Sequence, residues 1–290
     1  MSKSLRLVSQ RRGGFLWHYE PFITDFLVPL WLLKCRQHPD LESVYVQDTT
    51  DQSLGTFSPH AKELLGLDVY HVSPDGFEAL EDVPLHPLRG LGTGPYDFHD
   101  LHDVLQGLEG RFQMLDPSYP KVLLIDRRTA DLGFPTHPAA HNGSARRNID
   151  KHREVSDALF GLFGTQFRNV VLESLPPLEQ ARLFYNAELI IGEHGAGLCN
   201  LFFARPGTNL IELGPIFRPT FQRLAQRKPL GYHVLGQDQV PMPVFDPTRM
   251  PLRTKVDIPK LLGLVSVARY GSRVANAWPP GSESAGARQR

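Results

Sequence analysis

The residues of this 290-residue chain that could do chemistry gather around one glycine-rich loop, His194-Gly195-Ala196-Gly197. An apolar run, Leu189-Ile190-Ile191, precedes the loop and has the length and composition of a buried strand, and apolar residues at helical spacing follow it. Glycines at a helix start let backbone N–H groups approach an anion closely, and the helix dipole favours negative charge there. The pattern predicts a diphosphate cradle, although short glycine loops also serve simply to turn the chain.

Common nucleotide-binding fingerprints do not fit this loop. Gly192, Gly195 and Gly197 are spaced GxxGxG rather than GxGxxG, and the sequence contains no GxxxxGK motif followed by Ser or Thr. The spacing therefore argues against a dehydrogenase, and the missing motif argues against a kinase. The sequence also contains no Asp-x-Asp triplet, the usual metal ligand of single-domain sugar-nucleotide sites.

Two side chains near the loop could contact a nucleotide. His194 follows the strand and could donate a hydrogen bond to a phosphate or a sugar hydroxyl. Glu212 ends the next apolar run at the same sheet edge, where a carboxylate could bridge two ribose hydroxyls. The alternatives are structural: an imidazole that stabilises the loop and an acid that merely ends a strand.

Arginines flank a long polar loop, residues 129–144, in the same half of the chain. Arg127 and Arg128 follow the apolar run VLLID, and Arg146 lies just after the loop. The carboxyl end of a strand in a parallel sheet is the ligand-binding edge, and guanidinium groups suit a diphosphate. We therefore expect these arginines near the glycine loop, with a solvated basic surface as the alternative.

Apolar strands alternate with amphipathic helices in the second half, which predicts a doubly wound parallel sheet. The expected strands are 121–128, 170–173, 189–191, 209–213 and 232–235, and the expected helices are 155–163, 177–185, 198–203, 221–226 and 258–268. The first half suggests a smaller α/β unit, with helices within 13–36 and 58–67, strands at 41–47 and 69–72, and connecting loop over 75–94. A break at 116–120 divides the chain into an α/β domain (1–117), a Rossmann-like domain (118–270) and a disordered tail (271–290).

Composition excludes several classes of function. The 31 basic side chains balance 31 acidic ones, which argues against a nucleic-acid binder. No segment approaches the roughly 20 apolar residues of a membrane helix, so no membrane segment is expected. Asp97–Asp103 contains two histidines and three aspartates, but nothing completes a metal site there, so a solvated helix start is expected. Cys35 and Cys199 are expected to be buried free thiols.

The sequence GEHGAGLCN (192–200), followed by FARPG (203–207) and Ile211-Glu212-Leu213, resembles the GxHGAGLxN, FxxPG and E-hydrophobic signature of glycosyltransferase family 61. The segments LIDRR (124–128) with Arg146-Arg147-Asn148, and Trp17-His18 with LVPLW (27–31), are similar to further family segments. The resemblance covers the chain to about residue 265. Three features depart from the family pattern: Glu193 replaces a proline or small residue, the loop 129–144 is longer, and the N-terminal part is short and without the anchor of eukaryotic members.

The resemblance implies a GT-B fold, with two Rossmann-like domains facing a cleft, and an inverting transfer without a metal ion. A sugar would pass from a nucleotide diphosphate, expected to be a UDP-sugar, to a hydroxyl of a glycan or protein-linked acceptor. The expected donor-binding residues are Arg127, Arg128, Arg146, His194, Gly195, Ala196, Gly197, Asn200 and Glu212, and the candidates for the catalytic base are His18, Glu20 and Asp25. The alternative is a non-catalytic nucleotide- or carbohydrate-binding protein of the same fold. Location would be cytoplasmic in a bacterium, and in the Golgi or ER lumen in a eukaryote.

Overall fold

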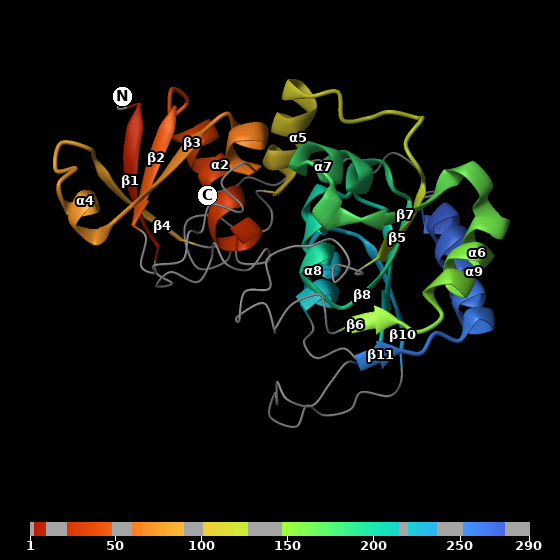
Figure 1. Ribbon diagram of the computed structural model, residues 1–290. Coiled ribbons are helices and arrows are strands. Elements are labelled where there is room, and N and C mark those ends of the chain that lie inside the picture. Colours follow the sequence, from red (N-terminus) through yellow and green to blue (C-terminus); the bar gives the residue numbers. More distant parts are fainter. Residues whose placement is uncertain are drawn as a thin grey trace, which may run out of the picture.

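The computed structural model describes residues 3–9, 22–47, 60–89, 101–126, 147–214, 220–236 and 252–275. In these ranges two parallel β-sheets, one from each half of the chain, are packed with helices (Figure 1). A small parallel sheet pairs β6 (Arg147–Ile149) with β11 (Leu252–Thr254). The expected α/β class with parallel sheets is confirmed.

The first sheet has four strands in the order β3-β2-β1-β4, all parallel. The strands are β1 (Ser4–Ser9), β2 (Ser43–Gln47), β3 (Asp68–Val72) and β4 (Leu85–Leu88). β1 and β4 were not predicted from the sequence, and β4 lies within the expected connecting loop. β4 contains Pro87, which an edge strand tolerates because its outer side needs no ladder hydrogen bond.

The helical elements of the first half are η1 (Phe22–Leu27), α2 (Val28–Arg36), η2 (Ala61–Leu65), α4 (Pro74–Glu78) and α5 (Leu101–Arg111). The segment expected as one helix begins with the π-helical turn η1 and continues as α2, whose residues 28–33 are all buried. A helix that is apolar on all sides is typical of a core. Gly66 caps the C-terminal end of η2, and its φ of 66° lies in the left-handed region that favours glycine.

The second sheet has five parallel strands in the order β10-β9-β8-β5-β7. The strands are β5 (Val122–Asp126), β7 (Phe167–Val171), β8 (Leu189–Glu193), β9 (Asn209–Leu213) and β10 (Gly231–Leu235). All five were expected, although β7 begins earlier than predicted and the 3-10 turn η8 (Leu172–Ser174) follows it. The chain leaves β5 toward β7 and then returns to β8, so the winding reverses between β5 and β8. Sheets of this kind bind ligands outside the carboxyl ends of the strands at that reversal.

Helices cover both faces of the second sheet (Figure 1). On one face lie α6 (His152–Phe163), which continues into the turn η7 (Gly164–Gln166), and α9 (Ile258–Ala275). On the other face lie α7 (Pro177–Asn186), the 3-10 helix η9 (Ala196–Phe203) and α8 (Thr220–Arg227). α9 reaches Ala275, so residues 271–275 are helical and the expected disordered tail begins too early; residues 276–290 lie outside the described ranges.

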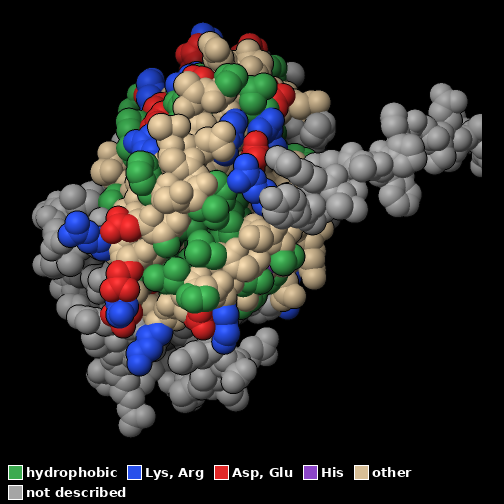
Figure 2. All heavy atoms as spheres, turned by 90° about the vertical axis from the view of Figure 1, so that its right-hand side faces the viewer, with side chains coloured by type: hydrophobic (Ala, Val, Ile, Leu, Met, Phe, Trp, Pro, Cys, Tyr) green, Lys and Arg blue, Asp and Glu red, His purple; other side chains and the backbone are tan. Residues whose placement is uncertain are grey.

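The outer side of α6 and α9 is less polar than a helix face normally is. Leu159 and Val265 point into the core, yet Phe160 and Leu162 of α6 and Val267 of α9 are exposed. Figure 2 shows hydrophobic side chains among the charged ones on this side of the molecule. The apolar residues on the inner side of these helices, such as Leu159 and Val265, pack against the second sheet and form the core on this face.

One cluster of buried apolar side chains runs from the first sheet through α2 and α5 to α7 and one face of the second sheet. The link at residues 116–120 is tied to α7: the Asp116 amide donates to Asn186 Oδ1 over 2.9 Å, and the Tyr119 hydroxyl donates to Glu179 Oε2 over 2.6 Å. The two sheets therefore share a core. The division into domains 1–117 and 118–270 stays a prediction.

Neither cysteine forms a disulfide: Cys199 is buried, but Cys35 is exposed, so the expected burial of both thiols is wrong for Cys35. Asp103, in the segment expected as a solvated helix start, lies in α5 and pairs with Arg36 at the end of α2.

Candidate active site

The glycine-rich loop follows β8, directly beside β5 at the reversal of winding. η9 begins at Ala196, and the Leu198 amide donates to the Gly195 carbonyl over 3.0 Å to close its first turn. The amides of Ala196 and Gly197 precede that bond and have no acceptor within a 3-10 helix. They are the donors that this turn can offer to an anion.

A buried amide pair holds the loop in shape. Asn200 is fully buried, and its Nδ2 donates to Gln180 Oε1 over 3.1 Å and to the Gly197 carbonyl over 3.2 Å. Gln180 in turn donates to the carbonyls of Leu172 and Leu175. The expected contact between Asn200 and a donor stays a prediction; the structure shows that the Asn200 side chain is hydrogen-bonded within the loop and to α7.

The glycines of the loop also permit close packing. A Cβ at position 197 would lie 2.9 Å from Leu172 Cδ1, and one at position 192 would lie 3.2 Å from Ile125 Cβ. Small residues are therefore required on the core side of the loop whether or not an anion binds. The glycine pattern by itself does not establish a phosphate site.

His194 is held from two elements. Its Nδ1 is hydrogen-bonded to Glu212 Oε1 at the end of β9, and its ring meets Phe221 of α8 edge-on, with ring centroids 5.1 Å apart. The His194 side chain is 13% exposed and that of Glu212 is 0% exposed, so the imidazole lies at the boundary between core and solvent. The structure thus brings together two residues that the sequence singled out.

The second oxygen of Glu212 accepts a hydrogen bond from the Tyr232 hydroxyl over 2.6 Å. Burial and this bond raise the pKa of Tyr232, so its hydroxyl stays protonated and remains a donor. With both oxygens engaged and no exposed surface, Glu212 does not present a carboxylate to ribose hydroxyls here. A direct contact between Glu212 and a nucleotide stays a prediction, and the structure shows Glu212 bonded to His194 and Tyr232.

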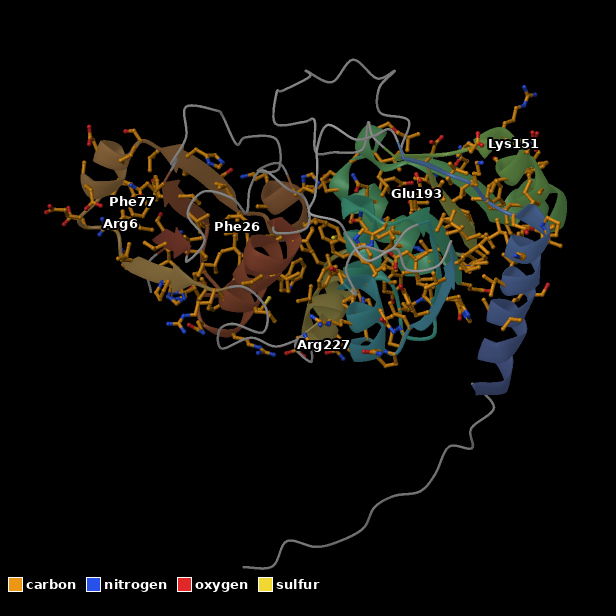
Figure 3. All side chains as sticks on the ribbon, turned by 90° about the horizontal axis from the view of Figure 1, so that it is seen from below. Arg6, Phe26, Phe77, Lys151, Glu193 and Arg227 are labelled. Carbon is orange, nitrogen blue, oxygen red and sulfur yellow. The ribbon has the colours of Figure 1, made fainter. Side chains whose placement is uncertain are left out.

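Glu193, one of the departures from the family pattern, points to the face of the second sheet opposite to that of Glu212. It alternates with Gly192 along β8 and so lies on the same face as Ile191, toward α6 and α9. It is 3% exposed, lies among the strands of the second half (Figure 3), and accepts a hydrogen bond from Thr254 Oγ1 over 2.6 Å. The extra carboxylate therefore anchors β11 and does not face the amides of the loop.

A second polar group on that face involves β5. Asp126 is buried at the strand end, accepts a hydrogen bond from Asn169 Nδ2 over 3.2 Å, and lies 3.5 Å from His152 Nε2. Sequence reasoning missed the roles of Asn169 and His152, and it also missed Tyr232, Phe221, Thr254 and Gln180. The alternation of strand residues is the signal that could have pointed to Tyr232 and Asn169.

Several of the predicted site residues lie outside the part of the chain that the structure describes. Arg127, Arg128, Arg146, His18 and Glu20 lie outside the described residues. Asp25 is part of η1. Among the residues that the structure covers, no three His, Cys, Asp or Glu side chains are arranged to hold a metal ion, and no helix there is long and apolar enough to cross a membrane.

A model of the glycosyltransferase 61 family matches residues 19–211. The chain belongs to glycosyltransferase family 61. The match includes the HGAG loop and ends directly before Glu212, so Tyr232, Phe221 and Thr254 lie beyond it.

Two plant proteins are similar to part of the chain. It is 32% identical over 110 residues to the β-1,2-xylosyltransferase RCN11 of Oryza sativa subsp. japonica, covering 36% of this chain and 20% of that protein. It is 32% identical over 114 residues to a β-1,2-xylosyltransferase of Arabidopsis thaliana, covering 35% of this chain and 21% of that protein. The chain matches about a fifth of the length of these curated relatives.

One similar solved structure is that of the dodecameric iron-containing heptosyltransferase TibC in complex with ADP-D-β-D-heptose. The two chains are 11% identical, with a TM-score of 0.38 over 93% of this chain and 76% of the other.

Proposed function

We propose that this chain is an inverting glycosyltransferase that moves a sugar from a nucleotide diphosphate, a UDP-sugar, to a hydroxyl of a glycan or protein-linked acceptor. Membership of glycosyltransferase family 61 supports the class of reaction. The observation that carries the placement of the donor is the position of residues 194–197 beside the reversal between β5 and β8. The donor is a substrate in this proposal, and no metal ion takes part.

In an inverting transfer the acceptor oxygen bonds to the anomeric carbon while the bond from that carbon to the diphosphate oxygen breaks. The acceptor proton passes to a general base, and the bonding electrons leave with the diphosphate. Fixed N–H donors and positive charge lower the barrier by stabilising the departing anion. We assign that role to the amides of Ala196 and Gly197 with His194, aided by the arginines at 127, 128 and 146.

The general base is proposed to come from the first half of the chain, from His18, Glu20 or Asp25. In a GT-B arrangement, residues 1–117 would hold the acceptor and residues 118–270 the donor, with the cleft between them. Two parallel sheets with separate carboxyl edges are compatible with this arrangement. Asn200 and Glu212 act behind the donor-binding groups, because both are fully buried.

The proposal is tested by titrating the protein with UDP and other nucleoside diphosphates by calorimetry, and then by following donor hydrolysis and transfer. Arg128→Ala is expected to weaken diphosphate binding by about 1.5 to 3 kcal/mol, the scale of a charged hydrogen bond. Arg153→Ala is the matched control, because Arg153 lies on α6 with its side chain 93% exposed. Binding without turnover of any donor would favour the non-catalytic alternative, and a lack of binding to any nucleoside diphosphate would remove both.

A further inference from the structure

Three side chains in the second half form one connected hydrogen-bonded line. The Tyr232 hydroxyl of β10 donates to Glu212 Oε2 over 2.6 Å, and Glu212 Oε1 is bonded to His194 Nδ1. The line crosses from an edge strand, over the neighbouring strand β9, to the loop that follows β8. It ends at the residue that starts the proposed diphosphate site.

Burial of the central carboxylate needs an explanation. Glu212 is 0% exposed on a strand whose neighbouring residues, Ile211 and Leu213, are apolar and buried. Removing a carboxylate from water costs several kcal/mol, and an apolar residue at such a position is often neutral or stabilising by comparison. A contribution to stability therefore does not by itself explain why a glutamate lies at this buried position.

The bond to Glu212 determines what His194 can do. The partner of one imidazole nitrogen fixes the tautomer and ring orientation, and here that partner engages Nδ1. Any contact between His194 and a donor diphosphate must then be made by Nε2. A doubly protonated ring donates from both nitrogens at once, from Nδ1 to Glu212 and from Nε2 to a phosphate oxygen.

The surrounding groups limit motion of this pair. Phe221 meets the imidazole edge-on, with centroids 5.1 Å apart, and Tyr232 fixes the carboxylate oxygen that is not bonded to His194. Loss of the tyrosine hydroxyl would leave a buried carboxylate oxygen without that donor and allow the carboxylate to turn. Reactive groups need such support, since small losses of orientation reduce rates strongly.

We propose that Tyr232 and Glu212 are positioning residues for the transfer, and that they hold His194 so that Nε2 meets the diphosphate of the donor. This inference rests on the proposed function of the same loop. Tyr232 lies outside the family match at residues 19–211, so its role follows from the contacts in the structure.

The decisive variant is Tyr232→Phe, which removes one hydroxyl and keeps the ring. We expect kcat/KM for the donor to fall about tenfold, the scale of one hydrogen bond to a charged group, with most of the loss in kcat. Tyr119→Phe is the matched control, because it removes another 2.6 Å tyrosine–glutamate hydrogen bond, at the link beside α7. Equal kinetics for the two variants would overturn the proposal.

A double-mutant cycle shows whether Tyr232 acts through His194. If it does, adding Tyr232→Phe to His194→Ala should lower kcat/KM by less than about twofold further, because the group that Tyr232 positions is already absent. Losses that multiply independently would contradict positioning. Thermal unfolding of all four proteins shows whether a variant has lost its fold.

Nitrogen-15 NMR of labelled histidine, with the His194 signals assigned by comparison with His194→Ala, tests the geometry without activity. We expect Nδ1 of His194 to carry a proton in the wild type, and its signal to move in Tyr232→Phe but not in Tyr119→Phe. A His194 ring protonated only at Nε2 would overturn the proposal. If the wild type binds no nucleoside diphosphate and turns over no donor, the proposed function fails. The NMR result separately shows whether the hydrogen bonds from Tyr232 through Glu212 determine the tautomer and orientation of the His194 ring.

Discussion

Glu193 is the last residue of β8, and Glu212 is the penultimate residue of the neighbouring parallel strand β9. Both are buried, and each accepts a 2.6 Å hydrogen bond from a hydroxyl. They point to opposite faces of the second sheet. Glu193 is tied to Thr254 in β11, on the face covered by α6 and α9, whereas Glu212 is tied to His194 and Tyr232 on the face of the glycine loop. The two glutamates share their residue type, their position near the end of a strand and their burial, yet they contact different elements. The face of the sheet on which a carboxylate lies determines which element it holds.

The largest expected effect on activity belongs to the loop face. Glu212→Gln keeps the shape of the side chain but replaces one oxygen by an NH2 group, so the amide can no longer accept from both His194 and Tyr232. We expect kcat to fall about a hundredfold, the scale seen when one transition-state donor is lost. The measurement is steady-state transfer from the donor.

The matched variant on the other face is Glu193→Gln, for which an activity within about twofold of the wild type is expected, because its remaining carbonyl oxygen can still accept from Thr254. If Glu193→Gln loses as much activity as Glu212→Gln, the distinction between the two faces is wrong.

Thr254→Val probes the stability of the α6/α9 face. The change removes the hydroxyl and keeps the branched shape, leaving buried Glu193 with one donor fewer. We expect a loss of about 1 to 3 kcal/mol in the free energy of unfolding, measured by urea denaturation. Transfer activity should stay close to that of the wild type at temperatures where the variant is folded.

Asn200→Ala tests whether the loop shape matters separately from His194. The variant removes the donor to the Gly197 carbonyl and to Gln180, so the first turn of η9 loses its internal support. We expect the KM for the donor to rise about fivefold, equivalent to roughly 1 kcal/mol. Asn169→Ala, which breaks the bond to Asp126 on the other face, should leave that KM nearly unchanged.

Among the changes to the loop and its supporting residues, the smallest effect is expected for Gly197→Ala. The added Cβ would meet Leu172 Cδ1, the movable end of a side chain, so it crowds the core rather than the diphosphate. Overpacking of this kind costs about 1 kcal/mol of stability, and donor affinity should change less than threefold. Gly161→Ala on α6 has nothing within 4 Å and should instead stabilise the protein, by about 0.5 to 1 kcal/mol. A tenfold loss of donor affinity in Gly197→Ala would contradict the packing explanation.

The second sheet could be predicted from the sequence because buried parallel strands are short apolar runs, as β5 and β8 are. β1 and β4 were missed for physical reasons. β1 alternates buried Leu5 and Leu7 with Ser4 and Arg6 in a short terminal segment, and β4 is an edge strand with a proline. The order and pairing of strands depend on contacts between distant residues, which local patterns do not contain.

The candidate site was predictable in part. The sequence places His194 and Glu212 at the same sheet edge, and the structure confirms that they lie together. Whether Glu212 faces a nucleotide or the imidazole depends on the register, in which Gly192 pairs with Glu212, and on the packing of β10 beside β9. The partner of Glu193 could not be predicted from the sequence, because Thr254 is distant in sequence. Thr254 is placed beside Glu193 by the pairing of β11 with β6.

The most direct test compares Tyr232→Phe with Thr254→Val in donor kcat/KM and in the free energy of unfolding. Each variant removes one hydroxyl that donates over 2.6 Å to a buried glutamate at a neighbouring strand end. We predict that Tyr232→Phe loses about tenfold in kcat/KM while Thr254→Val keeps its activity and loses stability. Equal activity in the two variants, or a loss confined to Thr254→Val, would contradict the assignment of the loop face to the donor.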